Sequence, residues 1–169
     1  MRNRRERLLP GPDERGVRCD WLWTSDLHLA WVYPRFGSLL LRRALAEWPI
    51  SFADAPVAGS GPVEVSFLVG HRGLDRLPLL QATLRAIAAQ EGAAVECIVV
   101  DQSTQAETRD ALPPWIHYVH TPPPEPQMPY ARSWAFNVGA REARGEMLVF
   151  HDNDILVPRS YARAIVGHA

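Results

Sequence analysis

Short runs of apolar residues alternate along most of the chain with longer segments in which apolar residues recur every three or four positions. The short runs predict strands, and the three-and-four spacing predicts amphipathic helices. Strands separated by helices are typical of βαβ units, so we expect an α/β domain with a mostly parallel sheet flanked by helices. Asp75 is the expected N-cap of its first helix. The expected strands cover 63–69, 96–100, 115–120 and 147–150, and the expected helices cover 77–90, 130–144 and 161–168.

The first 62 residues have a different pattern. Residues 1–18 are polar and rich in arginine, and we expect a mobile tail there. Residues 19–62 form a Trp-rich extension with an amphipathic stretch at 36–48 and a linker rich in proline and glycine at 55–62. The helix expected at 36–48 either packs on the main domain or offers a docking surface to a partner, an acceptor or a membrane. Residues 63–169 form the predicted α/β domain.

Composition narrows the classes of function. The chain has 169 residues and a formal net charge of −1, so a nucleic-acid-binding surface is not indicated. All 18 basic residues are arginine, which excludes Schiff-base and P-loop chemistry because both need a lysine amine. Cys19 and Cys97 lie far apart and predict reduced, partly buried thiols of a cytoplasmic protein. No apolar run approaches the roughly 18 residues of a membrane span, and no signal-peptide core follows the N-terminal arginines.

Two carboxylates follow the last predicted strand, at Asp152 and Asp154. In parallel sheets ligands bind beyond the carboxyl ends of the strands. In an extended segment these side chains share one face, where two unpaired carboxylates would repel each other. A divalent cation removes that conflict, and oxygen ligands favour Mg²⁺ or Mn²⁺, so the pair predicts a metal–diphosphate site. Two alternatives stay open: a solvated acidic turn, and a phosphatase with Asp152 as its nucleophile.

Other side chains at the predicted strand ends suit a nucleotide. Asp101 can accept a hydrogen bond from a ribose hydroxyl or a base, or organise a turn. His71 and Arg72 can face a nucleotide or lie in a solvated loop. Arg132 can meet a diphosphate or form a surface salt bridge, and His151 is either a ligand or a structural histidine. No Gly-x-Gly-x-x-Gly sequence follows the first strand, so a dinucleotide-binding unit is not indicated.

Four segments in this order resemble the nucleotide-sugar-binding half of family 2 glycosyltransferases of the GT-A fold. The segment 65–73, VSFLVGHRG, is similar to the family's opening strand and uridine-side loop. The segment 96–103, ECIVVDQS, is similar to its second strand and acidic turn. The segment 135–146, AFNVGAREARGE, resembles its Ala-Arg-Asn-x-Gly helix and Gly-Glu turn. Asp152-Asn153-Asp154 stands where the family has its Asp-x-Asp motif. The resemblance implies a GT-A-like (Rossmann-like) domain.

The resemblance also implies a function in polysaccharide biosynthesis. A metal-dependent glycosyltransferase would bind a nucleoside-diphosphate sugar, with a UDP-sugar as the leading donor, and transfer the sugar with inversion to a hydroxyl of a glycan or another acceptor. Asp152 and Asp154 would hold Mn²⁺ or Mg²⁺. We also expect a cytoplasmic location, with peripheral attachment to the inner face of the membrane as one option. A homo-oligomer is a further option. The residues implied in nucleotide-sugar binding are Gly70, His71, Arg72, Asp101, Gln102 and Asp152.

One part of the family pattern has no match in this sequence. The inverting enzymes use an Asp or Glu general base that deprotonates the acceptor hydroxyl, and the resemblance places that base beyond the Asp-x-Asp motif. This chain ends at Ala169, soon after Asp154. We therefore expect a domain that is incomplete at its C-terminus, and the catalytic base is unassigned. The alternative function is a truncated, non-catalytic remnant that binds a nucleotide sugar without transferring it.

Overall fold

The computed structural model describes residues 7–10, 17–20, 34–57 and 61–168. The chain divides into two units, Met1–Glu47 and Trp48–Ala169. Three tryptophans of the predicted Trp-rich extension, at positions 21, 23 and 31, lie outside the described residues. The expectation that the extension buries its aromatic side chains therefore stays a prediction.

The first unit contains two short strands and one helix. Strand β1 (Arg7–Pro10) pairs antiparallel with strand β2 (Val17–Asp20), and helix α2 spans Pro34–Glu47. The helix agrees closely with the one predicted at 36–48. The two strands lie within or beside residues 1–18, for which the sequence predicts a mobile tail. Among the described helices, none is both long and apolar enough to cross a bilayer.

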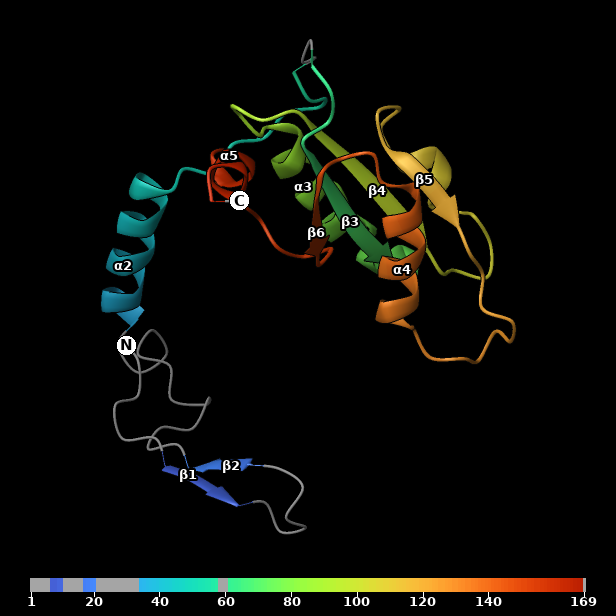
Figure 1. Cartoon of the computed structure of the whole chain (residues 1–169), viewed down its shortest axis with the longest axis horizontal. Coiled ribbons are helices and arrows are strands. Elements are labelled where there is room, and N and C mark those ends of the chain that lie inside the picture. The colour runs from blue at the N-terminus through green and yellow to red at the C-terminus, as the bar shows by residue number, and fades with distance from the viewer. Residues whose placement is uncertain (1–6, 11–16, 21–33, 58–60, 169) are drawn as a thin grey trace. The chain divides into compact units, whose positions relative to one another are not determined.

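The second unit is built on a four-stranded parallel sheet (Figure 1) with the strand order β5-β4-β3-β6. Every pair in it is parallel, which confirms the predicted mostly parallel α/β sheet. Strand β3 lies between β4 and β6 and is buried along its whole length, as a strand covered on both faces must be. The strands are β3 (Val65–His71), β4 (Val95–Asp101), β5 (His117–His120) and β6 (Met147–His151).

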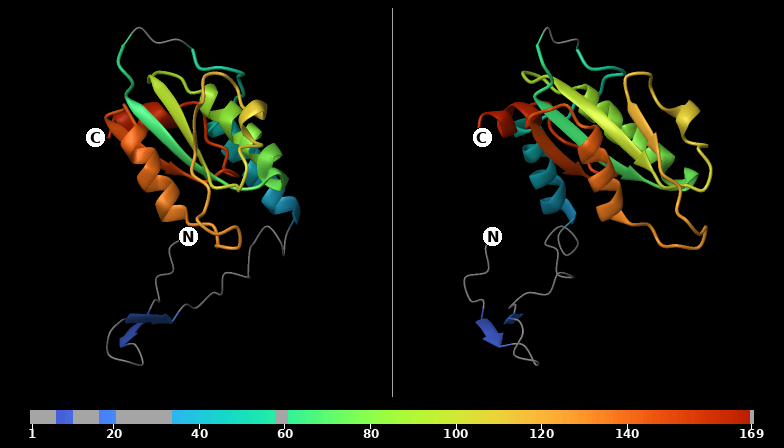
Figure 2. Two further views of the ribbon diagram at one scale, coloured as in Figure 1. Left: turned by 90° about the vertical axis from the view of Figure 1, so that its right-hand side faces the viewer. Right: turned by 45° about the vertical axis from the view of Figure 1, so that its right-hand side comes forward.

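Helices cover both faces of this sheet (Figure 2). Side chains alternate along β3, so Phe67 packs in one core cluster and Leu68 in another. Helix α3 contributes to the first cluster through Leu84, and helix α4 contributes to the second through Ala135. The first cluster is the larger of the two, and full burial of one large apolar side chain contributes about 1.5–3 kcal/mol. The helices are α3 (Leu77–Ala88), α4 (Arg132–Glu142) and α5 (Tyr161–Val166), with 3₁₀ turns η1 (Leu74–Arg76) and η2 (Arg109–Ala111).

Residues 48–57 are attached to the α/β unit, although the sequence groups them with the extension. The Ala53 N–H donates to the Arg85 carbonyl at 3.0 Å. The indole N–H of Trp115 donates to the Asp54 carbonyl at 2.9 Å. These two bonds join the segment to α3 and to the loop before β5.

The start of α3 differs from the prediction. Asp75 is not the N-cap: it lies inside η1, and Arg76 takes the N-cap position without a side-chain cap bond. Gly73, at φ 86°, turns the chain out of β3, and η1 then continues directly into α3. Arg76 is itself in a helical conformation, so no extended residue is available to act as a cap. The consequence is that Arg76 lies close to the end of β3.

A buried polar network ties β3 and β4 to the turn between α4 and β6. Glu96 Oε1 accepts hydrogen bonds from Ser66 Oγ and from the Arg144 backbone N–H, both at 2.7 Å. Its Oε2 accepts from Arg144 Nε at 2.8 Å. The Gly145 N–H donates to Ser66 Oγ at 2.8 Å. Burial opposes ionisation of Glu96, but the bonds from Ser66 and Arg144 outweigh it, so the pKa of Glu96 lies below its ordinary value of 4.5.

We expect Glu96→Gln to lower the free energy of unfolding by about 2 kcal/mol at pH 7, because a buried charge-assisted network loses its acceptor. The folded pKa is depressed, so this stabilisation is complete above the unfolded pKa and is lost as the pH falls through the folded pKa. The difference in the free energy of unfolding between wild type and variant should therefore become smaller below about pH 4.5. Urea unfolding at pH 7 and at lower pH measures both effects. Glu91→Gln, which breaks an exposed pair with Arg159, is the control and should change stability little. A constant gap at all pH values would contradict the assignment.

Candidate functional site

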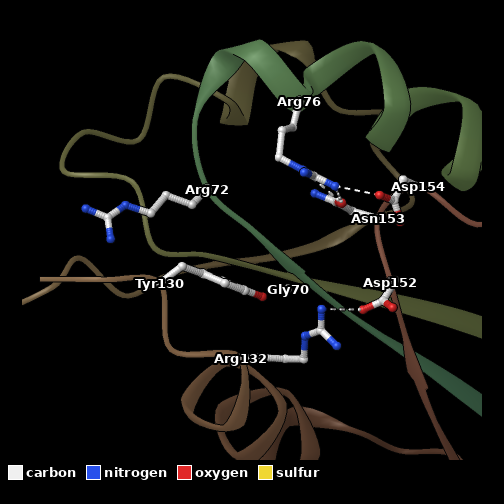
Figure 3. A pocket seen from close by; sticks show the side chains of 8 residues that line it. All are labelled: Gly70, Arg72, Arg76, Tyr130, Arg132, Asp152, Asn153 and Asp154. Carbon is white, nitrogen blue, oxygen red and sulfur yellow. Dashed lines mark hydrogen bonds and ion pairs between the residues drawn. The ribbon is translucent and has the colours of Figure 1, made fainter. Parts of the chain in front are cut away.

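A pocket of about 390 Å³ opens at the carboxyl ends of β3 and β6 (Figure 3). Parallel strands bring their carboxyl ends to one edge, so segments far apart in the sequence meet here. Four residues of the predicted nucleotide-sugar and metal sites line it together with four others, of which the sequence had singled out only Arg132 as a candidate. The predicted ones are Gly70, Arg72, Asp152 and Asp154, and the others are Arg76, Tyr130, Arg132 and Asn153.

The acidic segment after β6 faces two arginines. Arg76 Nη2 lies 2.7 Å from Asp154 Oδ2, and Arg132 Nη2 lies 3.4 Å from Asp152 Oδ1. The carboxylate side chains of Asp152 and Asp154 are 38% and 43% exposed, so each remains open to the pocket. Each carboxylate thus has one cationic partner, which relieves the repulsion expected for an acidic pair. Arg132 forms the surface salt bridge that the sequence offered as one interpretation, and it also lines the pocket. Its contact with a diphosphate stays a prediction.

Asn153 lies between the two acids and connects the pocket to its floor. Its Oδ1 accepts hydrogen bonds from Arg76 Nη2 at 3.0 Å and from Arg76 Nε at 3.3 Å. Its Nδ2 is 3.1 Å from Nδ1 of His71, which is fully buried. The amide therefore couples the exposed arginine to a buried imidazole.

Gly70 and Tyr130 make a close approach at the end of β3. A Cβ at position 70 would collide with the Tyr130 hydroxyl, so the glycine leaves room for this ring. Figure 3 shows Tyr130 pointing across the pocket between the arginines. Partial burial raises the pKa of Tyr130, so its hydroxyl stays protonated at neutral pH and can donate a hydrogen bond.

Arg72 and Gln102 hold the segment that enters α4. The Arg72 guanidinium donates to the carbonyls of Pro126, at 2.8 Å, and Met128. The Gln102 amide donates to the Ala131 carbonyl at 2.8 Å and accepts from the Ala131 N–H at 3.0 Å. Both side chains were predicted to bind the nucleotide. In this structure Arg72 holds the proline-rich segment 122–129 and Gln102 holds Ala131, and only Arg72 lines the pocket itself.

Asp101 and His71 lie beneath the pocket. Asp101 is fully buried: Oδ1 accepts from the N–H and hydroxyl of Ser103, at 2.8 and 2.6 Å, and Oδ2 from Tyr118 at 2.9 Å. These bonds organise the turn after β4. Burial lowers the pKa of His71 although the nearby Asp101 charge opposes this, so His71 is neutral at pH 7. Neither side chain reaches the pocket, and their assignment to nucleotide binding stays a prediction.

His151 has a structural environment. It is buried, its Nδ1 lies 2.6 Å from the Asp152 carbonyl, and its ring meets Phe67 edge-on. Burial lowers its pKa, although its bond to the Asp152 backbone opposes this. The structural role that the sequence offered for this histidine fits these contacts.

The sequence did not indicate roles for Arg76, Tyr130 or the Asn153 side chain. Arg76 stands 78 positions from Asp154 along the chain, and no local pattern links them. Tyr130 was expected to begin the helix at 130–144, but α4 begins at Arg132 and Tyr130 lies in the segment before it. Asn153 is part of the Asp-x-Asp segment itself, so its position was the one available signal.

The donor set at this edge fits an oxygen-preferring cation. Asp152 and Asp154 supply carboxylate oxygens and Asn153 an amide oxygen, and both carboxylates already attract cationic groups. Within the described part of the chain, no cluster of three or more His, Cys, Asp and Glu side chains is placed to hold an ion. A divalent cation would therefore complete its shell with water and ligand oxygens, as Mg²⁺ commonly does.

Comparisons with known proteins give the fold a context. A sequence model of glycosyl transferase family 2 matches residues 74–169. The mannosyltransferase PcManGT from Pyrobaculum calidifontis, solved with GDP-Man and Mn²⁺, has a TM-score of 0.50 and 24% identity over 81% of this chain and 41% of its own. S. aureus TarS 1–349 has a TM-score of 0.48 and 18% identity over 62% of this chain and 32% of its own. The chain thus spans less than half the length of these solved proteins. No curated protein sequence matches it.

Proposed function

This chain belongs to glycosyl transferase family 2, and from that premise we propose that its pocket binds a nucleoside-diphosphate sugar together with Mn²⁺ or Mg²⁺. The observation that carries the proposal is the lining of that pocket. Three arginines and two carboxylates share it: Arg72, Arg76, Arg132, Asp152 and Asp154. A diphosphate needs cationic partners and a divalent cation needs oxygen ligands, and this lining supplies both.

The roles we assign follow from charge and position. Arg132 and Arg76 have guanidinium groups at the rim, and a guanidinium suits the oxygens of a diphosphate. Asp152 and Asp154 are the carboxylates that would hold the cation, which when bound neutralises charge on the departing nucleoside diphosphate. Gln102 and Arg72 keep the segment before α4 in place. The chain's own contribution is to bind and orient the donor at this edge.

The proposed reaction is inverting transfer of the sugar to a hydroxyl of a glycan or another acceptor, with a UDP-sugar as the first donor to test. Such a transfer needs a general base that takes the acceptor proton. We assign the residues that line the pocket to donor binding. We assign none of the residues that the structure describes as that base. A second candidate function is therefore binding without transfer. It is supported by the same lining, to which we assign donor binding and no base.

Calorimetric titration with UDP, GDP and their sugars, first with Mn²⁺ and then with EDTA, tests the proposal. We expect one nucleotide to bind with Mn²⁺ and binding to weaken strongly when EDTA removes the ion. Absence of nucleotide binding by the folded protein would contradict the proposal. Transfer to an acceptor, or slow hydrolysis of the bound donor, separates the enzyme from the binding module. Hydrolysis of small phosphomonoesters would instead support the phosphatase alternative.

A further inference from the structure

Arg76 binds two residues of the acidic segment in the pocket, Asn153 and Asp154. It lies where η1 passes into α3, directly after the turn that ends β3. Its Nη2 donates to Asp154 Oδ2 at 2.7 Å and to Asn153 Oδ1 at 3.0 Å, and its Nε lies 3.3 Å from the same Asn153 oxygen. Figure 3 shows this side chain reaching from α3 onto the acidic segment.

The two other arginines of the pocket have different partners. Arg132 is 3.4 Å from Asp152, a longer ion pair than that of Arg76. Arg72 points away from the acids in Figure 3 and donates to two backbone carbonyls. Of the three arginines, Arg76 is therefore the one that contacts Asp154 Oδ2 and Asn153 Oδ1.

Arg76 occupies one oxygen of Asp154, Oδ2, at 2.7 Å. A divalent cation on the same carboxylate would repel the guanidinium, because like charges only a few ångströms apart repel each other. Binding of the ion therefore favours a position of Arg76 away from this oxygen. The side chain is 44% exposed, so it is free to turn into the pocket, where the oxygens of a diphosphate would offer it a new anionic partner.

We propose that Arg76 is an internal counter-ion of Asp154 that competes with the divalent cation and is released toward the diphosphate when the nucleotide binds. This inference rests on the proposed function and deepens it. In the free protein Arg76 keeps the affinity for the ion alone low. When the nucleotide binds, it attracts Arg76 and frees Asp154, so nucleotide and ion strengthen each other's binding. Such coupling is reciprocal by thermodynamic necessity.

The first test is a titration of the full chain with Mn²⁺ alone. The electron paramagnetic resonance signal of the free ion measures how much Mn²⁺ remains unbound. A partly exposed ion pair contributes modestly, so we expect Arg76→Met to lower the Kd for Mn²⁺ by about three- to tenfold. Arg85→Met is the matched control, because it removes the same charge from α3, the helix that follows Arg76, while its partner is Asp54, outside the pocket. It should leave the Kd within about twofold of wild type. Arg76→Lys keeps the charge but has no fork to bridge both oxygens, and it should fall between wild type and Arg76→Met.

The second test repeats the Mn²⁺ titrations with saturating UDP. In the wild type UDP should lower the Kd for Mn²⁺, and in Arg76→Met this enhancement should be smaller. Equal Mn²⁺ affinity in wild type and both Arg76 variants, with UDP and Mn²⁺ still binding together, would overturn the inference and leave the proposed function standing. Nucleotide binding in EDTA that Arg76→Met abolishes would also overturn it, because Arg76 would then replace the ion. If no variant binds Mn²⁺ with or without UDP, the proposed function fails and the inference fails with it.

Discussion

Asp154→Asn is expected to abolish Mn²⁺-dependent nucleotide binding, with a loss of at least about 100-fold in affinity. The change keeps the size of the side chain but removes the negative charge that attracts the cation. Asp154 is also the acid that Arg76 holds at 2.7 Å, so the variant loses the charge balance of the pocket at the same time. Titration calorimetry with UDP or GDP and Mn²⁺ measures the effect.

The fold should survive this change. The Asp154–Arg76 pair is partly exposed on both sides, and such pairs contribute about 0–1 kcal/mol to stability. Asp110→Asn, in the exposed turn η2, removes the same charge away from the pocket and should leave binding unchanged. Full retention of Mn²⁺-dependent nucleotide binding in Asp154→Asn would contradict the assignment of Asp154 as a metal ligand. Asp152→Asn should weaken binding as well, because its carboxylate lines the same pocket.

The second large effect is on stability and concerns Gly145, in the turn between α4 and β6. A Cβ at this position would lie 2.6 Å from Ser66 Oγ, 2.7 Å from the Ser66 nitrogen and 2.9 Å from the Val65 carbonyl carbon. Two of these atoms belong to the backbone of β3, the strand paired with neighbours on both sides, so they cannot move aside. We expect Gly145→Ala to lower the free energy of unfolding by about 3 kcal/mol through overpacking and loss of the bonds around Ser66.

Gly61→Ala is the matched control for this prediction. A Cβ at position 61 would meet nothing within 4 Å, so the same methyl group should change stability by less than about 0.5 kcal/mol. Urea unfolding of the two variants and the wild type, followed by circular dichroism, gives the comparison. Equal stability of Gly145→Ala and Gly61→Ala would show that β3 and the turn can separate without cost.

The expected effect of Gly145→Ala bears on how the site is built. Gly145 lets the turn after α4 approach β3 closely, and β6 then pairs with β3 and carries the acidic segment to the end of that strand. Arg76 reaches this segment from the other side of the same strand end. The stability of the β3–β6 pair is therefore a condition for the pocket, and Gly145→Ala should also weaken nucleotide binding wherever it unfolds the protein.

Much of the α/β unit could be predicted from local pattern. Each strand and helix after residue 63 lies close to its predicted place, because its apolar residues repeat with the period of the element they form. The position of Asp152 and Asp154 at a strand end was predictable for the same reason. The start of α3 was not, because the 3₁₀ turn that follows Gly73 depends on backbone geometry that Asp75 does not reveal.

For the polar residues at the strand ends, the position could be predicted from the sequence but the bonding partners could not. Asp101 and Gln102 were predicted from their place after β4, and they do lie there. Their bonding partners are Tyr118 and the Ala131 backbone, 17 and 29 residues further along the chain. Whether a strand-end side chain faces the pocket or its floor depends on which segment packs over it, and that segment is distant in sequence.

The class of fold, the family and the acidic segment could be inferred from the sequence, because each depends on residues that are close together in the chain. Which cations face those acids depends on the folded sheet. Arg76 and Asp154 are 78 positions apart, and they meet because β3 and β6 are adjacent parallel strands whose carboxyl ends share one edge. Charge interactions fall off with distance in space, not along the chain. The electrostatics of the pocket are therefore a property of the folded sheet.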